Sequence, residues 1–378
     1  MEFPASMESN LRDGLKIERM SKPSQNDVFE FCGPLYLNNV NCLILLGNTE
    51  HRRSVAASLV QGVYVAEFDR QQKREGYDVL APIWWEFFHF KCIQALEDKT
   101  DSSIFGAIFE YKHAIPNRLN STQDIPPRYV IALRGTIIKP KTGLQDCYLD
   151  AKIILHELKC SSRYEIALHV VEDLLSVTDP KDVWLTGHSL GAAMTLQAEK
   201  DMAKRGCYVE TYLFNPPYAS APIEMLHSRK LKNGARITHS VVTAGLSYAL
   251  KRTKNNTNTT HEECDPFSTT LRSWIPYLFV NPHDTICCEY IGYFEHREKM
   301  ERWGAGGIEK IATKNSVVNL LKNALGKDGD ALHLIPSGFV TMNMKNMIVK
   351  EKGLSLAHGL CQWWEQYSCW QSKLYQYN

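Results

Sequence analysis

Apolar residues recur along the chain at two spacings, which predict helices in some segments and strands in others. Val55, Leu59 and Val63 recur at helical spacing, and Ser54 is a suitable cap for their helix. A second helix is expected after Pro82, where five aromatic residues stand close together. We expect their rings in the core against a sheet, and an aromatic wall for an acyl pocket is the alternative.

Further along, short apolar runs alternate with longer amphipathic ones. Helices are expected at 158–175 and 190–204. The runs with strand character are 104–111, 128–133, 182–186 and 209–214. Strands that alternate with helices of roughly 10–15 residues favour an α/β fold. Its sheet is expected to be mostly parallel and covered by helices on both faces.

Polar segments interrupt this pattern but do not separate two cores. Residues 1–27 are polar and aperiodic, so we predict a flexible N-terminal arm. Polar insertions are expected near 251–270 and 295–330, at the surface. No repeat of about 20–50 residues is visible. Residues 28–378 are therefore predicted to form a single domain.

Composition narrows the functional class. The 378 residues are 44% hydrophobic and 22% charged, as in a soluble globular protein. The 43 Lys and Arg against 42 Asp and Glu leave no basic footprint for nucleic acid. Eleven cysteines without a C-x-x-C pair indicate neither a disulfide framework nor a zinc ribbon. No segment resembles a secretory signal or reaches the roughly 18 apolar residues of a membrane span. A cytoplasmic protein is expected, with at most transient membrane-surface contact.

The segment 183–191 carries the clearest chemical signal. It reads V-W-L-T-G-H-S-L-G, a predicted strand followed by G-x-S-x-G and the start of a helix. In a nucleophile elbow this sharp turn lifts the serine clear of the sheet, and close approach of the backbone requires Gly187 and Gly191. The amide of Leu190 at the helix N-terminus is suited to stabilise an oxyanion. Ser189 is the predicted nucleophile, and an ordinary strand-to-helix turn is the alternative.

Three segments resemble the class 3 (fungal-type) lipases of the α/β-hydrolase superfamily, especially their plant lipase-like members. They are G-H-S-L-G at 187–191, Y-V-I-A-L-R-G-T at 129–136 and T-Y-L-F-N-P-P at 211–217. The second is similar to the family's strand ending in F-R-G-[ST], and the third stands where the family has T-F-G-x-P. D-C-Y-L-D at 146–150 looks like a degraded D-W-x-x-D segment. The resemblance implies an α/β-hydrolase fold.

The resemblance also implies roles for residues around the serine. Thr136 matches the residue that completes the oxyanion hole beside the amide of Leu190. His188, within the elbow, matches a position that the family uses structurally. The segment 136–149 corresponds to a lid over the acyl site.

A serine hydroxyl needs a base, and the base needs an orienting carboxylate. In this fold the chain order is Ser, then Asp or Glu, then His. Asp284 follows the apolar run 274–280 and resembles the family's N-x-x-D-x-[VI] motif. Asp265, within a polar insertion, is the weaker candidate.

Two of the thirteen histidines remain as candidates for the base. His358 lies in a predicted loop that enters an aromatic-rich C-terminal helix, and it resembles the family's base position. His333 lies in an apolar, strand-like run and is the alternative. His283 is expected to point away from its neighbour Asp284, and His296 is expected to be solvated.

The sequence thus predicts a serine carboxylic-ester hydrolase, a lipase or esterase that cleaves acyl esters with Ser189, Asp284 and His358 as its triad. The resemblance implies that these esters are lipids. No metal-ligand spacing and no nucleotide-binding glycine motif occurs, so no cofactor is expected. The alternative is a catalytically dispensable lipase-like scaffold that binds protein partners in signalling. Leu133, the altered segment 146–150 and the unmatched insertions favour that alternative, whereas an intact candidate triad favours the enzyme.

Overall fold

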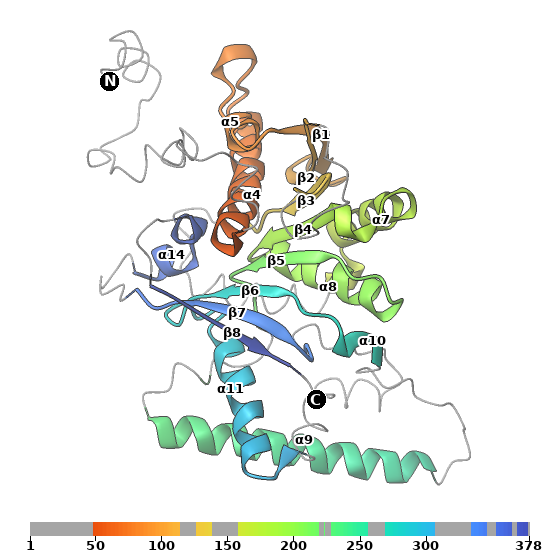
Figure 1. The fold of residues 1–378 in the computed structure, drawn as a ribbon, viewed down its shortest axis with the longest axis vertical. Coiled ribbons are helices and arrows are strands. Elements are labelled where there is room, and N and C mark those ends of the chain that lie inside the picture. The colour runs from red at the N-terminus through yellow and green to blue at the C-terminus, as the bar shows by residue number, and fades with distance from the viewer. Residues whose placement is uncertain are drawn as a thin grey trace.

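Eight strands lie side by side in one sheet in the same order as in the chain (Figure 1). The computed structural model describes residues 48–113, 126–137, 158–218, 223, 228–255, 269–306, 334–345, 353–364 and 369–376. The strands are β1 (Phe90–Glu97), β2 (Ile104–Tyr111), β3 (Tyr129–Leu133), β4 (Val183–His188), β5 (Glu210–Phe214), β6 (Tyr277–Val280), β7 (Gly338–Asn343) and β8 (Trp370–Tyr375).

The centre of the sheet is parallel and its edges are antiparallel. Strands β3 to β7 pair in parallel, whereas β1 pairs antiparallel with β2, β2 with β3, and β7 with β8. The carboxyl ends of the parallel strands therefore meet at one edge, which is where α/β sheets usually place their ligands. The predicted α/β fold with a mostly parallel sheet is confirmed.

Helices cover both faces. They are α4 (Thr49–Gln71), α5 (Ile83–Glu86), α7 (Ser162–Val177), α8 (Leu190–Lys204), α9 (Arg229–Asn255), α10 (Thr269–Arg272), α11 (Glu289–Arg302) and α14 (Gly353–His358). Short 3₁₀ turns are η2 (Gly76–Asp78), η3 (Leu158–Cys160), η4 (Pro180–Asp182) and η6 (Leu360–Trp363). Helix α4 begins at the cap Asn48, whose side chain accepts from the amide of Glu50. This cap lies six residues before the predicted cap, Ser54.

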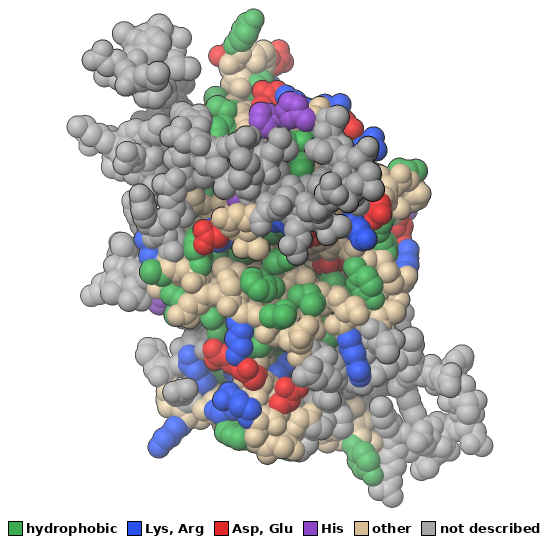
Figure 2. Space-filling model, in the orientation of Figure 1, with side chains coloured by type: hydrophobic (Ala, Val, Ile, Leu, Met, Phe, Trp, Pro, Cys, Tyr) green, Lys and Arg blue, Asp and Glu red, His purple; other side chains and the backbone are tan. Residues whose placement is uncertain are grey.

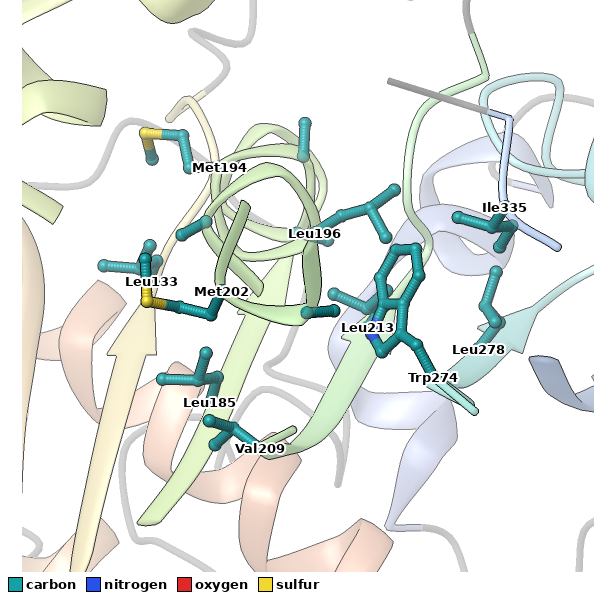
Figure 3. Packing of buried hydrophobic residues seen from close by; sticks show 14 of the residues in the cluster. Leu133, Leu185, Met194, Leu196, Met202, Val209, Leu213, Trp274, Leu278 and Ile335 are labelled. Carbon is teal, nitrogen blue, oxygen red and sulfur yellow. The ribbon is translucent and has the colours of Figure 1, made fainter. Parts of the chain in front are cut away.

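Alternation along the strands divides the core between the two faces. One face packs against α7, α8 and α11, and Figure 3 shows Leu185 and Leu213 of the sheet beside Leu196 and Met202 of α8. The other face packs against α4, and Trp184 lies there one position from Leu185. Burial on both faces explains why these strands are continuous apolar runs.

The aromatic segment after Pro82 differs from its prediction. Only Ile83–Glu86 is helical, and Phe90 already opens β1, a strand that the sequence did not predict. Aromatic residues are as compatible with strands as with helices, so tertiary pairing with β2 decides the outcome. Trp84, Trp85 and Phe90 are buried in the core on the α4 side, as the core interpretation of these rings predicted.

Both predicted insertions begin within helices. Residues 251–255 are the last five of α9, and 295–302 are the last eight of α11. The rest of the insertion near 251–270 up to residue 268, residues 307–330 of the other, and the predicted arm 1–27 lie outside the described residues. None of the described helices is long and apolar enough to cross a membrane.

Candidate active site

Ser189 occupies a strained turn between a strand and a helix. It follows β4 directly and caps α8, with φ 54° and ψ −124°. A side chain on Gly187 would come within 2.6 Å of the Gly191 backbone, and one on Gly191 would overlap the carbonyl oxygen of Leu133. This left-handed conformation is unfavourable for serine, and strain of this kind concentrates at functional sites. The strand–turn–helix context predicted for G-x-S-x-G is present.

The residues predicted for the oxyanion hole flank this turn. Gly135 packs so closely on the elbow that an added Cβ would lie 2.8 Å from Ser189 Cβ, and Thr136 follows it as an exposed residue. On the other side, the first intrahelical donor of α8 is the amide of Ala193, which bonds Ser189 O. The amide of Leu190 precedes that donor and is not used within the helix.

Asp284 and His358 meet at the same edge of the sheet. Asp284 lies four residues beyond β6, and His358 is the last residue of α14, which lies where β4, β5 and β6 end (Figure 1). His358 Nδ1 is 2.8 Å from Asp284 Oδ2, and both side chains are buried. The prediction placed His358 in a loop before a helix, whereas it ends one short helix and precedes η6.

The environment of Asp284 favours its charged form. Burial opposes ionisation, but the His358 ring and hydrogen bonds from His358, Asn215 and Cys287 hold the pKa of the Asp284 carboxyl below its ordinary value. The amide of Ile286 also donates to Asp284 Oδ1. Because an ionised carboxylate only accepts, His358 Nδ1 must donate to it. Neutral His358 then carries its free lone pair on Nε2, the atom that a general base needs.

Asn215 is a site residue that the sequence analysis did not single out. It follows β5 with φ 47°, and its side chain is fully buried. Its Nδ2 donates to Asp284 Oδ2 at 2.7 Å and to Ala357 O at 3.0 Å, and its Oδ1 accepts from Trp363 Nε1. A polar residue directly after a central strand was the available signal, since strand ends deliver side chains to this edge.

A series of hydrogen bonds runs through Tyr64 and His188. It joins the turn that follows β3 (residues 134–136, called the oxyanion turn below) to the backbone of His358. The amide of Gly135 donates to Tyr64 Oη, and Tyr64 Oη lies 2.8 Å from His188 Nδ1. His188 Nε2 lies 2.7 Å from the carbonyl oxygen of His358. No local feature of the sequence marked Tyr64, because it lies on α4, 124 residues from His188.

Burial determines which atoms donate and which accept in this series of hydrogen bonds. Burial, together with the neighbouring His358, lowers the pKa of His188 to about 3, so the ring is neutral near pH 7. Its Nε2 must carry the proton, because the carbonyl of His358 can only accept. Nδ1 of His188 therefore accepts from Tyr64, whose pKa burial raises to about 12. These contacts give His188, inside the elbow, hydrogen-bond partners on both ring nitrogens.

The remaining candidates fall into two groups. Asp265, His333 and the predicted lid segment from residue 138 to 149 lie outside the described residues. Of the others, His283 is exposed beside Asp284, as expected. His296 was predicted to be solvated, and this is wrong: its ring is buried, 3.0 Å from Ser240 Oγ, because α9 covers that side of α11.

The structure brings Ser189, Asp284 and His358 to one edge of the sheet, but the serine and the histidine are not hydrogen-bonded. Among the described residues, no hydrogen bond within 3.5 Å joins the Ser189 hydroxyl to His358. Serine–histidine bonds are often long before substrate binds. No cluster of three or more His, Cys, Asp or Glu side chains that could hold a metal occurs in the described ranges.

A separate cavity of about 80 Å³ lies at the start of α4, over β5 to β8. Five of its eleven lining residues are aromatic, among them Tyr212, Tyr277 and Trp370, and the other six are polar or charged. Ser189, Asp284 and His358 do not line it. The cavity therefore does not extend the site at the sheet edge.

Comparison with known proteins places the chain in a family. No protein-family model matches it. The GDSL esterase/lipase At4g10955 of Arabidopsis thaliana is 44% identical over 361 residues, which cover 94% of this chain and 99% of that protein. The chain belongs to this esterase/lipase family. The relationship confirms the prediction of a carboxylic-ester hydrolase as the class of enzyme.

The comparison supports the family resemblance only at the level of a lipase-like hydrolase. The relative of this esterase/lipase is described as a GDSL enzyme, which is a different lipase family from the class 3 lipases that the sequence motifs resemble. What the motifs and the relative have in common is a lipase-like hydrolase. The eight-stranded mixed sheet with helices on both faces is an α/β fold.

Proposed function

We propose that this esterase/lipase cleaves acyl esters with a triad of Ser189, Asp284 and His358. The observation that carries the proposal is the buried hydrogen bond between His358 Nδ1 and Asp284 Oδ2, at the sheet edge where Ser189 occupies its strained turn. It supplies a base with a defined tautomer at the sheet edge that carries the half-buried Ser189. A buried Asp–His pair of this kind is the arrangement that activates serine in unrelated hydrolases.

The proposed reaction proceeds through an acyl-enzyme. Ser189 Oγ attacks the ester carbonyl while His358 Nε2 takes its proton, and the amides of Thr136 and Leu190 donate to the oxyanion. When the tetrahedral intermediate collapses, the C–O bond to the alcohol breaks and His358 returns the proton to that alcohol. Water then attacks the acyl group with His358 again as the base, which releases the carboxylic acid and the free serine.

Within the esterases and lipases, we infer the α/β-hydrolase arrangement of class 3 lipases. The candidate serine lies in G-H-S-L-G between a parallel strand and a helix, and the order Ser, Asp, His along the chain is that of α/β-hydrolases. The R-G-T turn follows β3, the strand beside β4. The sequence Gly-Asp-Ser-Leu does not occur in this chain.

The substrate class follows from the same resemblance. We infer an acyl ester, with lipid esters as the physiological group, and no cofactor. The mechanism above uses protein side chains, backbone amides and water alone.

Labelling by a fluorophosphonate probe tests the proposal, because the probe reacts with activated serines. The full chain should be labelled and should hydrolyse short p-nitrophenyl esters, and Ser189→Ala should lose both. In subtilisin, removal of the nucleophile lowers kcat by about 10⁶. Ser176→Ala removes an exposed hydroxyl near the end of α7 and is the matched control. Labelling that persists in folded Ser189→Ala would assign the chemistry to another residue, and a wild-type chain that is never labelled would favour the scaffold alternative.

A further inference from the structure

Helix α9 presents to solvent a surface that the proposed active site does not explain. Its 27 residues span about 40 Å at the usual rise of 1.5 Å per residue. Figure 1 shows it along the lower side of the molecule, next to α11 and away from the edge that carries α14. Its contacts with α11 include the Arg236–Glu289 ion pair at 2.5 Å and the Ser240–His296 contact at 3.0 Å.

The side of α9 that faces the protein is polar. Arg236, Ser240, Thr243 and Ser247 are all buried. At 100° per residue they fall within a sector of about 60° on the helix. A surface helix normally turns its apolar stripe toward the core, so α9 has the reverse arrangement.

The outward side of α9 carries four large hydrophobic side chains, with Gly234, Thr238 and Gly245 exposed between them. Leu231, Val241, Val242 and Tyr248 are 63%, 50%, 52% and 70% exposed. They fall within a sector of about 120° that lies opposite the buried residues. Figure 2 shows hydrophobic side chains projecting at the lower surface, where Figure 1 places α9.

All the charged residues of α9 are positive. The helix contains seven of the chain's 43 Lys and Arg and none of its 42 Asp and Glu. Three of the seven lie within the first four residues and three within the last five, and they are Arg229, Lys230, Lys232, Arg236, Lys251, Arg252 and Lys254. The net charge of the whole chain is only +1, so this helix concentrates positive charge that the rest of the chain offsets.

We propose that α9 docks the protein on an anionic lipid surface. The exposed Leu231, Val241, Val242 and Tyr248 would enter the boundary between headgroups and acyl chains, while the exposed Lys230 at the start of the helix contacts lipid phosphates. Amphipathic helices with apolar residues on one side and Lys or Arg around them bind the plane of the membrane in this way. Each Lys or Arg near an anionic surface strengthens attraction, and the absence of acidic residues from α9 removes repulsion.

This docking is independent of ester cleavage, so its test does not depend on the proposed triad. Flotation of the full chain with vesicles measures binding directly. We expect binding to phosphatidylcholine vesicles that contain 30% phosphatidylserine, by mole, at about tenfold or greater affinity than to pure phosphatidylcholine. Raising the salt from about 0.1 M to 1 M shortens the Debye length from about 10 Å to 3 Å and should weaken this binding.

Two variants separate the apolar and the electrostatic contributions. Val241→Ser with Val242→Ser should reduce binding to the anionic vesicles at least about tenfold, and so should Lys230→Glu with Lys251→Glu. Val177→Ser with Lys181→Glu alters an exposed valine and an exposed lysine near the end of α7, and this matched control should bind like the wild type. Circular dichroism and the melting temperature verify that each variant is folded.

Three outcomes would overturn the proposal. The first is the absence of flotation with anionic vesicles, and the second is equal binding of the wild type and both α9 variants. The third is a wild-type dimer, seen by sedimentation, that the Val241→Ser, Val242→Ser variant abolishes while vesicle binding is absent. That result would identify a second copy of the chain as the occupant of this surface.

Discussion

Asn215 Nδ2 lies 2.7 Å from Asp284 Oδ2, the same oxygen that accepts the hydrogen bond from His358 Nδ1. Asn215 also donates to the carbonyl of Ala357, the residue before His358. One buried amide therefore orients both the carboxylate and the backbone of its histidine partner. Its backbone, at φ 47°, is one that asparagine tolerates better than most residues.

Replacement of Asn215 should lower kcat with little change in KM. Asn215→Gly removes the side chain while it preserves the positive φ, which glycine adopts freely. We expect kcat to fall by about tenfold or more, because Asp284 and His358 lose a shared positioning contact. Steady-state kinetics on a soluble ester measures this. Asn343→Ala removes another buried amide, bonded to Gln362, and is the control for a general loss of stability. Equal kinetic losses in the two variants would contradict a positioning role.

Loss of the Tyr64 hydroxyl should affect both stability and rate. Tyr64→Phe leaves the amide of Gly135 and Nδ1 of His188 without these partners, which should lower the free energy of unfolding by about 1–3 kcal/mol. We expect kcat to fall by about tenfold to a hundredfold, because the oxyanion turn and the His358 backbone are no longer joined. Urea denaturation and ester hydrolysis measure the two effects. Tyr129→Phe, which loses a bond to Glu110, is the control. Unchanged kcat in Tyr64→Phe would contradict this role.

The choice of base is tested by two histidine variants. His358→Ala should abolish turnover and strongly suppress fluorophosphonate labelling, because Ser189 loses its proton acceptor. His333→Ala should retain both. The opposite pattern, with both proteins folded, would make His333 the base.

Asp284→Asn tests the role of the carboxylate that His358 contacts. It should lower kcat by about 10⁴ if the carboxylate holds the tautomer of His358, as it does in the serine proteases. Binding of the soluble ester should change little, so the loss should appear in kcat. A variant that is folded and fully active would exclude Asp284 from the triad.

Glu199 should make the protein less stable at alkaline pH. It lies buried on α8, and burial raises the pKa of its carboxyl to about 8 from 4.5. The folded chain therefore binds this proton more tightly than the unfolded chain, so the contribution of the proton to stability is complete below about pH 4.5 and is lost as pH rises through 8. Glu199→Gln should raise the urea midpoint at pH 8.5 and have little effect at pH 4.5. Glu75→Gln, at an exposed glutamate, should do neither. A destabilised Glu199→Gln protein at pH 8.5 would contradict this assignment.

The local features of this protein followed from its sequence. The predicted bounds of β2 and α8 match the structure, and the G-x-S-x-G turn occurs between a strand and a helix as its glycines require. These features depend on residues within a few positions of one another. The spacing of apolar residues, the steric limits of the turn and helix capping are therefore sufficient to predict them. The pairing of Asp284 with His358 was also predicted, but through resemblance to a family whose motifs both residues match.

Only the tertiary structure decided the features that depend on distant segments. Phe90 is in a strand because β2 pairs with it, and His296 is buried because α9 covers it. Asn215 contacts Asp284, 69 residues away, and Tyr64 contacts His188 across 124 residues. No periodicity or motif connects positions so far apart. Packing of helices against the two faces of the sheet brings them together, and burial then sets their hydrogen bonds and pKa values.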